Sequence, residues 1–166
     1  MTRKQIYDRW NRMKYRVKNH PSYKNVSICE EWYSFENFYN WVLQHKELIN
    51  SYDNWDIDKD ILQLGKDSKI YSPKTCCILP SAINKAINFS NHKTMLGCHY
   101  DSERKLWQCK VRVHNKTKFL GRFKTSDEAH KVYKDFKLNH INNLLNEYSI
   151  KDSLKIKIIK YVKYYL

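Results

Sequence analysis

The chain has 166 residues, of which 31 are Lys or Arg and 17 are Asp or Glu, so its formal net charge at pH 7 is +14. This length allows one ordinary domain or two small ones, and the abundant aromatic residues exclude a disordered chain. The charge predicts attraction to polyanions such as nucleic acids. It is concentrated in residues 96–166, which hold 16 basic and 7 acidic residues, against 15 and 10 in residues 1–95.

The five cysteines are odd in number and include no CxxC pair. This pattern argues against a disulfide framework and against a structural zinc site, so no zinc is expected. The sequence shows no signal peptide and no apolar run of the length that crosses a bilayer. We therefore expect a cytoplasmic protein without a membrane partner, and the sequence leaves its oligomeric state unknown.

The first half is predicted to combine helices with short strands. Residues 2–18 are expected to form a helix, because apolar residues recur every three or four positions on one face. Ser34 is expected to cap a second helix. Apolar and acidic residues alternate over 54–62, which predicts a strand. A further helix is expected over 81–88, and the polar stretch 88–93 is the predicted linker.

The second half is predicted to be a small sheet followed by helices. Every second residue of 107–113 is apolar and the residues between are polar or basic, as in a strand with one face on a core and one open to a polyanion. Residues 115–116 are expected to turn a hairpin. Thr125 and Glu128 form a T-x-x-E capping box at the start of a helix. Ser149 is expected to cap the last helix.

The segment MLGCHYDSERKLWQCKVRVHNKTKFLGRFKTSDEAHKVYKDF, residues 95–136, resembles the AP2 DNA-binding domain. Gly97 matches a glycine of the family's first strand, and Trp107 matches an aromatic residue of its second strand. FLGRFKTSDEAHKVY matches its third strand and capped helix. The resemblance implies a three-stranded antiparallel sheet that enters the major groove of double-stranded DNA, with the helix packed behind it.

The same resemblance implies which side chains contact DNA. Toward the bases it places His99, Arg104, Gln108, Lys110 and Arg112. Toward the phosphates it places Lys105, Lys116, Lys118 and Arg122. Arg112 and Gln108 are the predicted base readers, because arginine can pair with guanine and glutamine with adenine through two hydrogen bonds. Leu96 and His99 stand where the plant-type pattern has arginines, so the recognised base sequence does not transfer.

The first half has a resemblance of its own. The segments YDRWNRMKYRV, SYKNVSICEEWYSFENFYNW, IDKDIL and KIYSPKTCCILPSAIN are similar to phage-encoded HNH endonuclease-like proteins. In that family a strand hairpin and the following helix hold a divalent metal against the scissile phosphate, and a histidine activates water. Such proteins often join this half to an AP2-like half, and homing endonucleases are the best-known members.

The HNH resemblance implies an altered catalytic site, with Asp58 and Lys59 as the candidate catalytic residues. Asp58 and Asn84 match the two metal-ligand positions, so Mg²⁺ is the cofactor that an active site would use. Lys59 replaces the histidine base. A protonated lysine cannot accept a proton, and the neighbouring carboxylates favour the charged form. The asparagine that should orient the base is also missing, because Thr75 and Cys76 occupy its place.

Together these observations predict an α+β chain in three parts. Residues 1–90 form a degenerate HNH-like half of the ββα-metal kind. Residues 95–142 form the AP2-like domain, a three-stranded antiparallel sheet with a packed helix. Residues 143–166 form a C-terminal helical extension.

The predicted function is that of a DNA-binding protein derived from a phage HNH–AP2 homing endonuclease, with its nuclease site degraded, acting as a repressor or by occupying a site. One alternative is an active Mg²⁺-dependent nicking or homing endonuclease. Another is a phage counter-defence protein that binds and inhibits a host nucleic-acid-handling complex, with RNA or a protein as its partner. The implied location is the cytoplasm of a phage-infected bacterial host.

Overall fold

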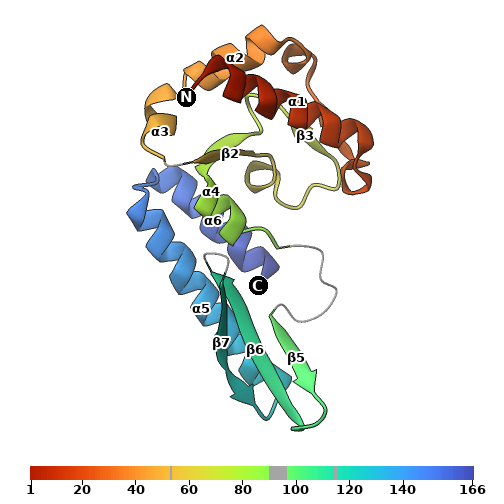
Figure 1. Ribbon diagram of the computed structural model, residues 1–166, viewed down its shortest axis with the longest axis vertical. Helices are drawn as coiled ribbons and strands as arrows, with labels where there is room; N and C mark the ends of the chain where they lie inside the picture. The colour runs from red at the N-terminus through yellow and green to blue at the C-terminus, as the bar shows by residue number, and fades with distance from the viewer. Residues whose placement is uncertain (53, 90–96, 114–115) are drawn as a thin grey trace. The chain divides into compact units, whose positions relative to one another are not determined.

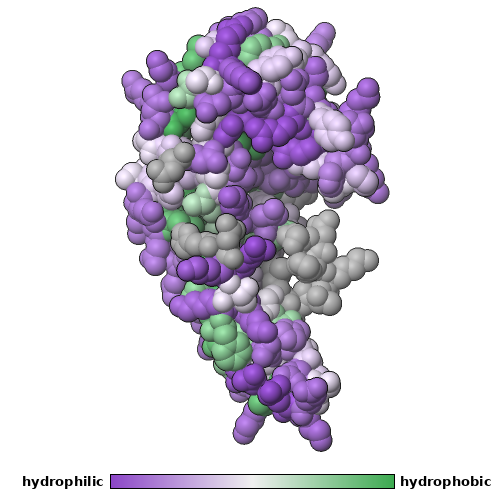
Figure 2. Space-filling model, viewed as in Figure 1, coloured by the Kyte–Doolittle hydropathy of each residue, from purple (hydrophilic) through white to green (hydrophobic). Residues whose placement is uncertain are grey.

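The computed structural model describes residues 1–52, 54–89, 97–113 and 116–166, and in these residues the chain is mixed α+β with three small sheets (Figure 1). It forms two compact units, Met1–Ser81 and Ala82–Leu166. Across the described ranges, no helix has the length and apolar character needed to cross a membrane. The surface seen in Figure 2 is mostly hydrophilic, in keeping with the high net charge.

Helix α1, Arg3–Asn19, opens the first unit and begins at a complete capping box. The Thr2 hydroxyl accepts a hydrogen bond from the Gln5 backbone, and the Gln5 side chain accepts one from the Thr2 backbone. The helix ends before Pro21, as the sequence predicts. Its buried face consists of Ile6, Trp10 and Met13. The predicted helix and its apolar face are therefore confirmed.

Helix α2, Phe35–Leu43, is capped by Ser34, whose hydroxyl accepts a hydrogen bond from the Asn37 backbone. This confirms the predicted cap. Helices α1 and α2 pack side by side (Figure 1). The centre of this core is an aromatic cluster with ring centroids 4.8–6.3 Å apart, made by Trp32, Phe38 and Trp41.

Two pairs of short strands complete the first unit. Strand β1, Val26–Ile28, pairs in parallel with β3, Lys69–Tyr71. Strand β2, Trp55–Asp58, pairs in antiparallel with β4, Cys77–Pro80. The remaining helical pieces are η1 (Pro21–Tyr23), η2 (Glu30–Tyr33), α3 (Lys46–Asn50) and η3 (Ile61–Gln63). Strand β2 is shorter than the strand predicted over 54–62, because the chain turns after Asp58.

The second unit contains the predicted three-stranded antiparallel sheet, in the order β5-β6-β7. Its strands are β5 (Cys98–Asp101), β6 (Leu106–Val113) and β7 (Lys116–Phe123). Helix α4, Ser81–Ala86, precedes the sheet and is shorter than the helix predicted over 81–88. Helix α5, Ser126–Glu147, follows it. The predicted capping box is confirmed, because the side chains of Thr125 and Glu128 each accept a hydrogen bond from the other residue's backbone.

Helix α5 packs against one face of the sheet, and the side chains between the helix and the sheet form a hydrophobic core. Cys109 and Val111 of β6 are buried there against Ala129 and Tyr133 of α5. Trp107 and Val113 pack against the same cluster. The apolar alternation predicted for residues 107–113 is therefore confirmed.

The last part of the chain differs in detail from the prediction. Helix α5 continues to Glu147, so the predicted boundary at residue 142 falls inside it. Helix α6, Asp152–Tyr165, begins after Lys151 and not at Ser149, which has a positive φ of 48°. Of the predicted linker 88–93, residues 90–93 lie outside the described residues, as does residue 115 of the predicted hairpin turn.

Candidate functional site

The strand register assigns each residue of the second unit's sheet to one of two faces. Directly opposed residues of antiparallel strands point to the same side of a sheet. Cys98, Cys109 and Gly121 form one such row, on the side covered by α5. The next row, made by His99, Gln108 and Arg122, points to the opposite side of the sheet. The side opposite α5, here called the outer face, carries His99, Gln108, Lys110, Arg112, Thr117, Phe119 and Arg122.

A β-bulge in β7 changes the alternation on this face. Cys109 opposes Gly121 and Lys110 opposes Phe119, so the intervening Leu120 has no partner in the ladder. Leu120 packs into the core on the α5 side. Gly121 has a φ of 144°, which favours glycine at this point. As a result Phe119 and Arg122, three positions apart, share the outer face, and the Arg122 guanidinium lies 5.2 Å from the centre of the Phe119 ring.

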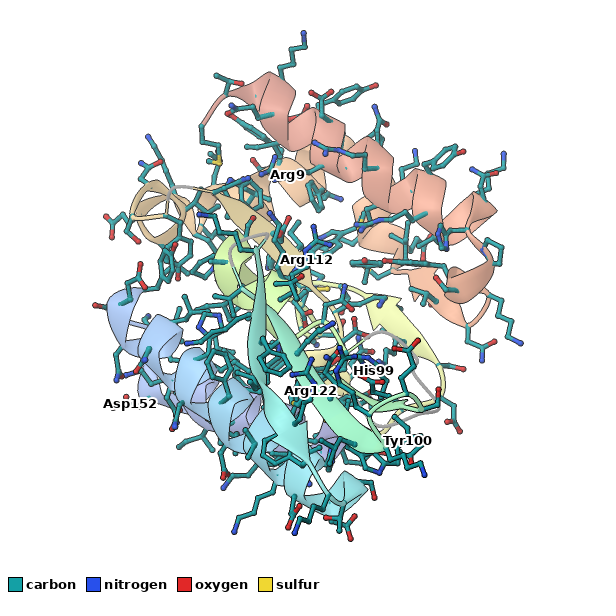
Figure 3. All side chains as sticks on the ribbon, turned by 60° about the horizontal axis from the view of Figure 1, so that its bottom comes forward. Arg9, His99, Tyr100, Arg112, Arg122 and Asp152 are labelled. Carbon is teal, nitrogen blue, oxygen red and sulfur yellow. The ribbon has the colours of Figure 1, made fainter. Side chains whose placement is uncertain are left out.

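The strand register brings five of the nine predicted DNA-contacting residues together on the outer face: His99, Gln108, Lys110, Arg112 and Arg122. Three of them, His99, Arg112 and Arg122, are labelled in Figure 3. Arg112 is exposed, whereas Gln108, in the central strand between His99 and Arg122, is only 8% exposed. Of the two predicted base readers, Arg112 is thus the more accessible.

The other four predicted residues lie elsewhere. Lys116 and Lys118 oppose core-facing residues of β6, and the Lys118 ammonium lies 4.9 Å from the Phe136 ring of α5. Arg104 and Lys105 lie in the turn between β5 and β6, where the Arg104 guanidinium pairs with Asp101 at 3.2 Å. Their predicted DNA contacts stay predictions.

The outer face is strongly cationic. Among the described residues of the three strands, Asp101 is the only acidic one. That carboxylate accepts a hydrogen bond from the Arg104 backbone and lies near the positive charges of Arg104 and Arg122, which lowers the pKa of Asp101 below its usual value. It therefore stays ionised and holds Arg104 beside the sheet, leaving Lys110, Arg112 and Arg122 as the cations that the strands present.

Sequence reasoning missed Phe119 as an outer-face residue. Its ring is 48% exposed and lies among cationic side chains. A strict period of two places Phe119 and Arg122 on opposite faces. The signal that points to the true arrangement is Gly121, because a glycine inside a strand often marks a bulge.

The second candidate site lies in the first unit, where β2 ends. The Asp58 side chain is 8% exposed, and its Oδ1 accepts hydrogen bonds of 2.8 Å from the backbone N–H groups of Asp60 and Ile61. These two bonds close the turn that leads into η3, which is why the strand stops here. Burial raises the pKa of Asp58 to about 6, against the lowering effect of the Ile61 hydrogen bond.

Lys59 is engaged in an ion pair. Its Nζ lies 2.9 and 3.0 Å from the two carboxylate oxygens of Asp60, and 5.0 and 5.8 Å from the ring centres of Tyr23 and Tyr71. Lys69 pairs with the same carboxylate at 2.5 Å. Burial favours a higher pKa for Asp60, but the two ammonium groups outweigh it and lower that pKa.

No group of three or more His, Cys, Asp or Glu residues that could hold a metal occurs in the described part of the chain. Of the two predicted metal ligands, Asp58 caps a turn through Oδ1, and Asn84 lies in α4. At the position expected for the orienting asparagine, the Thr75 hydroxyl donates to the Ile70 carbonyl, and burial raises the pKa of the Cys76 thiol to about 12.

Comparison with known proteins identifies no relative: no protein family, no curated protein and no solved structure matches this chain.

Proposed function

We propose that this protein binds double-stranded DNA sequence-specifically by inserting the outer face of its β5-β6-β7 sheet into the major groove. The observation that carries the proposal is the gathering of His99, Gln108, Lys110, Arg112 and Arg122 on the face opposite α5. A narrow ribbon of strands can enter the major groove, where each base pair presents a distinct pattern of donors and acceptors.

Charge and groove shape favour DNA over RNA as the partner. Cations on the outer face displace counterions from phosphates, which supplies sequence-independent affinity. The major groove of A-form RNA is too deep and narrow for side chains to read, whereas that of B-form DNA is wide. A sheet that presents its readers on a broad face therefore suits duplex DNA.

The first unit supports the view that the protein derives from an HNH–AP2 homing endonuclease whose nuclease site has been lost. Strands β2 and β4 pair in antiparallel, and α4 follows β4 along the chain, which is the ββα order that the resemblance implies. Asp58 and Lys59, however, are engaged in a turn and an ion pair. The proposed role is thus site occupation or repression without cleavage.

Replacing Arg112 with alanine should weaken binding to the preferred duplex by about 1–3 kcal/mol and relax the preference at one base pair. Arg112 is an exposed cation of the outer face. Fluorescence anisotropy with duplexes selected from a random pool measures both effects, and the affinity of the wild type should fall steeply with added salt.

Lys118→Ala is the matched control, because Lys118 lies on the α5 side of the same sheet. It should weaken all duplexes alike and leave the sequence preference unchanged. If Lys118→Ala relaxes the preference and Arg112→Ala does not, the wrong face of the sheet has been assigned to the bases.

Cleavage is not expected with any divalent metal. Supercoiled plasmid and selected duplexes incubated with Mg²⁺ or Mn²⁺ should remain intact, because Lys59 stands in place of the histidine base and is paired with Asp60. Gel electrophoresis of the products measures this. Nicking by the wild type that Asp58→Ala abolishes would show that the endonuclease alternative is correct.

A further inference from the structure

The β-bulge in β7 creates an arrangement that a regular strand cannot form. Residues 119 and 122 of a regular strand would point to opposite faces, whereas the unpaired Leu120 brings Phe119 and Arg122 to the same face. The two side chains then stack, with the guanidinium carbon 5.2 Å from the ring centre. Both residues are exposed.

The contact with the ring restricts the guanidinium group. An arginine held over an aromatic ring has fewer orientations open to it and gives up less conformational freedom when it binds. A phosphate contact needs only a positive charge, whereas recognition of guanine needs two donors aligned with O6 and N7. The geometry of Arg122 therefore suits a base, although the sequence resemblance placed it toward phosphate.

The Phe119 ring supplies a different chemistry at the next position. It is a large apolar surface on a face made of cationic and polar side chains, between Lys110 on β6 and the Arg122 guanidinium. In the major groove the apolar group that a base presents is the 5-methyl of thymine. If Arg122 contacts one base pair, the Phe119 ring beside it can contact the thymine methyl group of the neighbouring base pair.

We propose that Arg122 and Phe119 form a two-residue base reader, in which Arg122 pairs with a guanine and Phe119 contacts the methyl group of an adjacent thymine. This inference rests on the proposed DNA-binding function and assigns part of its sequence preference. Gln108 lies between His99 and Arg122 in the central strand and is itself largely buried.

The test selects bound duplexes from a random pool with the wild type, Arg122→Lys, Phe119→Ala and, as the control, Arg3→Lys. Arg122→Lys keeps the charge but loses the fork of donors. Arg3 is an exposed arginine that also lies 5.2 Å from an aromatic ring, that of Phe35, but it belongs to α1 in the first unit. Anisotropy on the wild-type winner then compares guanine with 7-deazaguanine, which lacks N7, and thymine with uracil, which lacks the methyl.

The wild type should enrich a guanine next to a thymine. Arg122→Lys should lose about 5- to 150-fold of the preference for that guanine, and the penalty for 7-deazaguanine should shrink, while bulk duplex affinity and its salt dependence persist. The wild type should bind the uracil duplex about fourfold more weakly than the thymine duplex, which is the effect of burying one methyl group. Phe119→Ala should bind the thymine and uracil duplexes equally. Arg3→Lys should retain the wild-type motif.

An enriched motif that Arg122→Lys and Phe119→Ala leave unchanged would overturn the base reader and leave the proposed function standing. Failure of the wild type to bind or enrich any duplex would overturn the proposed function itself. Circular dichroism confirms folding, and Phe119→Leu, which keeps an apolar side chain without the ring, replaces Phe119→Ala if that variant is unfolded.

Discussion

Replacing Gly97 with alanine is expected to lower the free energy of unfolding of the second unit by about 2–5 kcal/mol. A Cβ at this position would overlap the Tyr133 ring of α5 and lie 2.7 Å from the Lys110 carbonyl oxygen. Gly97 also has a φ of 71°, a conformation that costs any other residue about 1–2 kcal/mol. Urea unfolding, with hydrogen exchange of β5 and β6 as the local probe, measures the loss.

Gly65→Ala separates the cost of the positive φ from the cost of the steric overlap with Tyr133. Gly65 has a similar φ of 79°, but a Cβ there meets no atom within 4 Å, so only the backbone cost remains. The alanine at position 97 should also cost less in a Tyr133→Ala background, because the ring that it meets is gone. Equal costs at positions 65 and 97 would mean that close packing of β5 on α5 does not hold this sheet together.

This close approach matters for the outer face as well. The Gly97 carbonyl accepts a hydrogen bond of 2.8 Å from the Lys110 backbone, which sets the register of β5 on β6. That register places His99 opposite Gln108. Duplex affinity of Gly97→Ala should therefore fall together with the stability of the sheet.

The sequence was most informative where a local interaction decides the structure. The caps at Ser34 and Thr125 each depend on residues within three positions along the chain, and both are confirmed. The three-stranded antiparallel sheet that the AP2 resemblance implied is also present in the second unit, where the strands follow one another and are joined by short connections.

Prediction was weaker where partners are distant in the chain or where a strand is irregular. The parallel pairing of Val26–Ile28 with Lys69–Tyr71 joins segments about forty residues apart and has no local signal. The bulge at Leu120 shifts the alternation of β7 by one residue. The faces of the sheet on which Lys118 and Phe119 lie could therefore not be predicted from a regular two-residue alternation.

The acidic stretch around Asp58 shows how a candidate site can be altered by its local backbone. Asp58 Oδ1, one of the two oxygens with which this carboxylate could hold a metal, accepts two backbone hydrogen bonds at the end of β2. Its neighbour Asp60 pairs with both Lys59 and Lys69. The sequence shows these residues, but only the structure of the turn after β2 shows the hydrogen bonds and ion pairs that they make with neighbouring groups.

Asp58→Asn is expected to change how stability depends on pH. The pKa of Asp58 is about 6 in the folded chain and about 3.9 in the unfolded chain, so the folded state binds more protons between these values. The associated stability is fully present below about pH 4 and is lost as the pH rises through about 6. The wild type should lose about 3 kcal/mol over that range, whereas the amide has no charge to bury.

Urea unfolding of both proteins at a series of pH values measures the effect. The asparagine retains an acceptor for the N–H groups of Asp60 and Ile61, so the variant should be equal to or more stable than the wild type above about pH 6. Asp58→Ala removes that acceptor and should cost about 1–3 kcal/mol. Asp67→Asn, at an exposed position in the turn before β3, is the control and should follow the wild-type curve.

The same variants test whether Asp58 retains any role as a metal ligand. A cation that binds only the folded state raises stability, and it would bind the ionised carboxylate but not the amide. Millimolar Mg²⁺ at neutral pH should therefore leave the wild type and Asp58→Asn equally unaffected. Stabilisation of the wild type alone would show a working metal site and would revive the endonuclease alternative. Parallel pH curves for the two proteins would instead show that Asp58 is not buried in the folded chain.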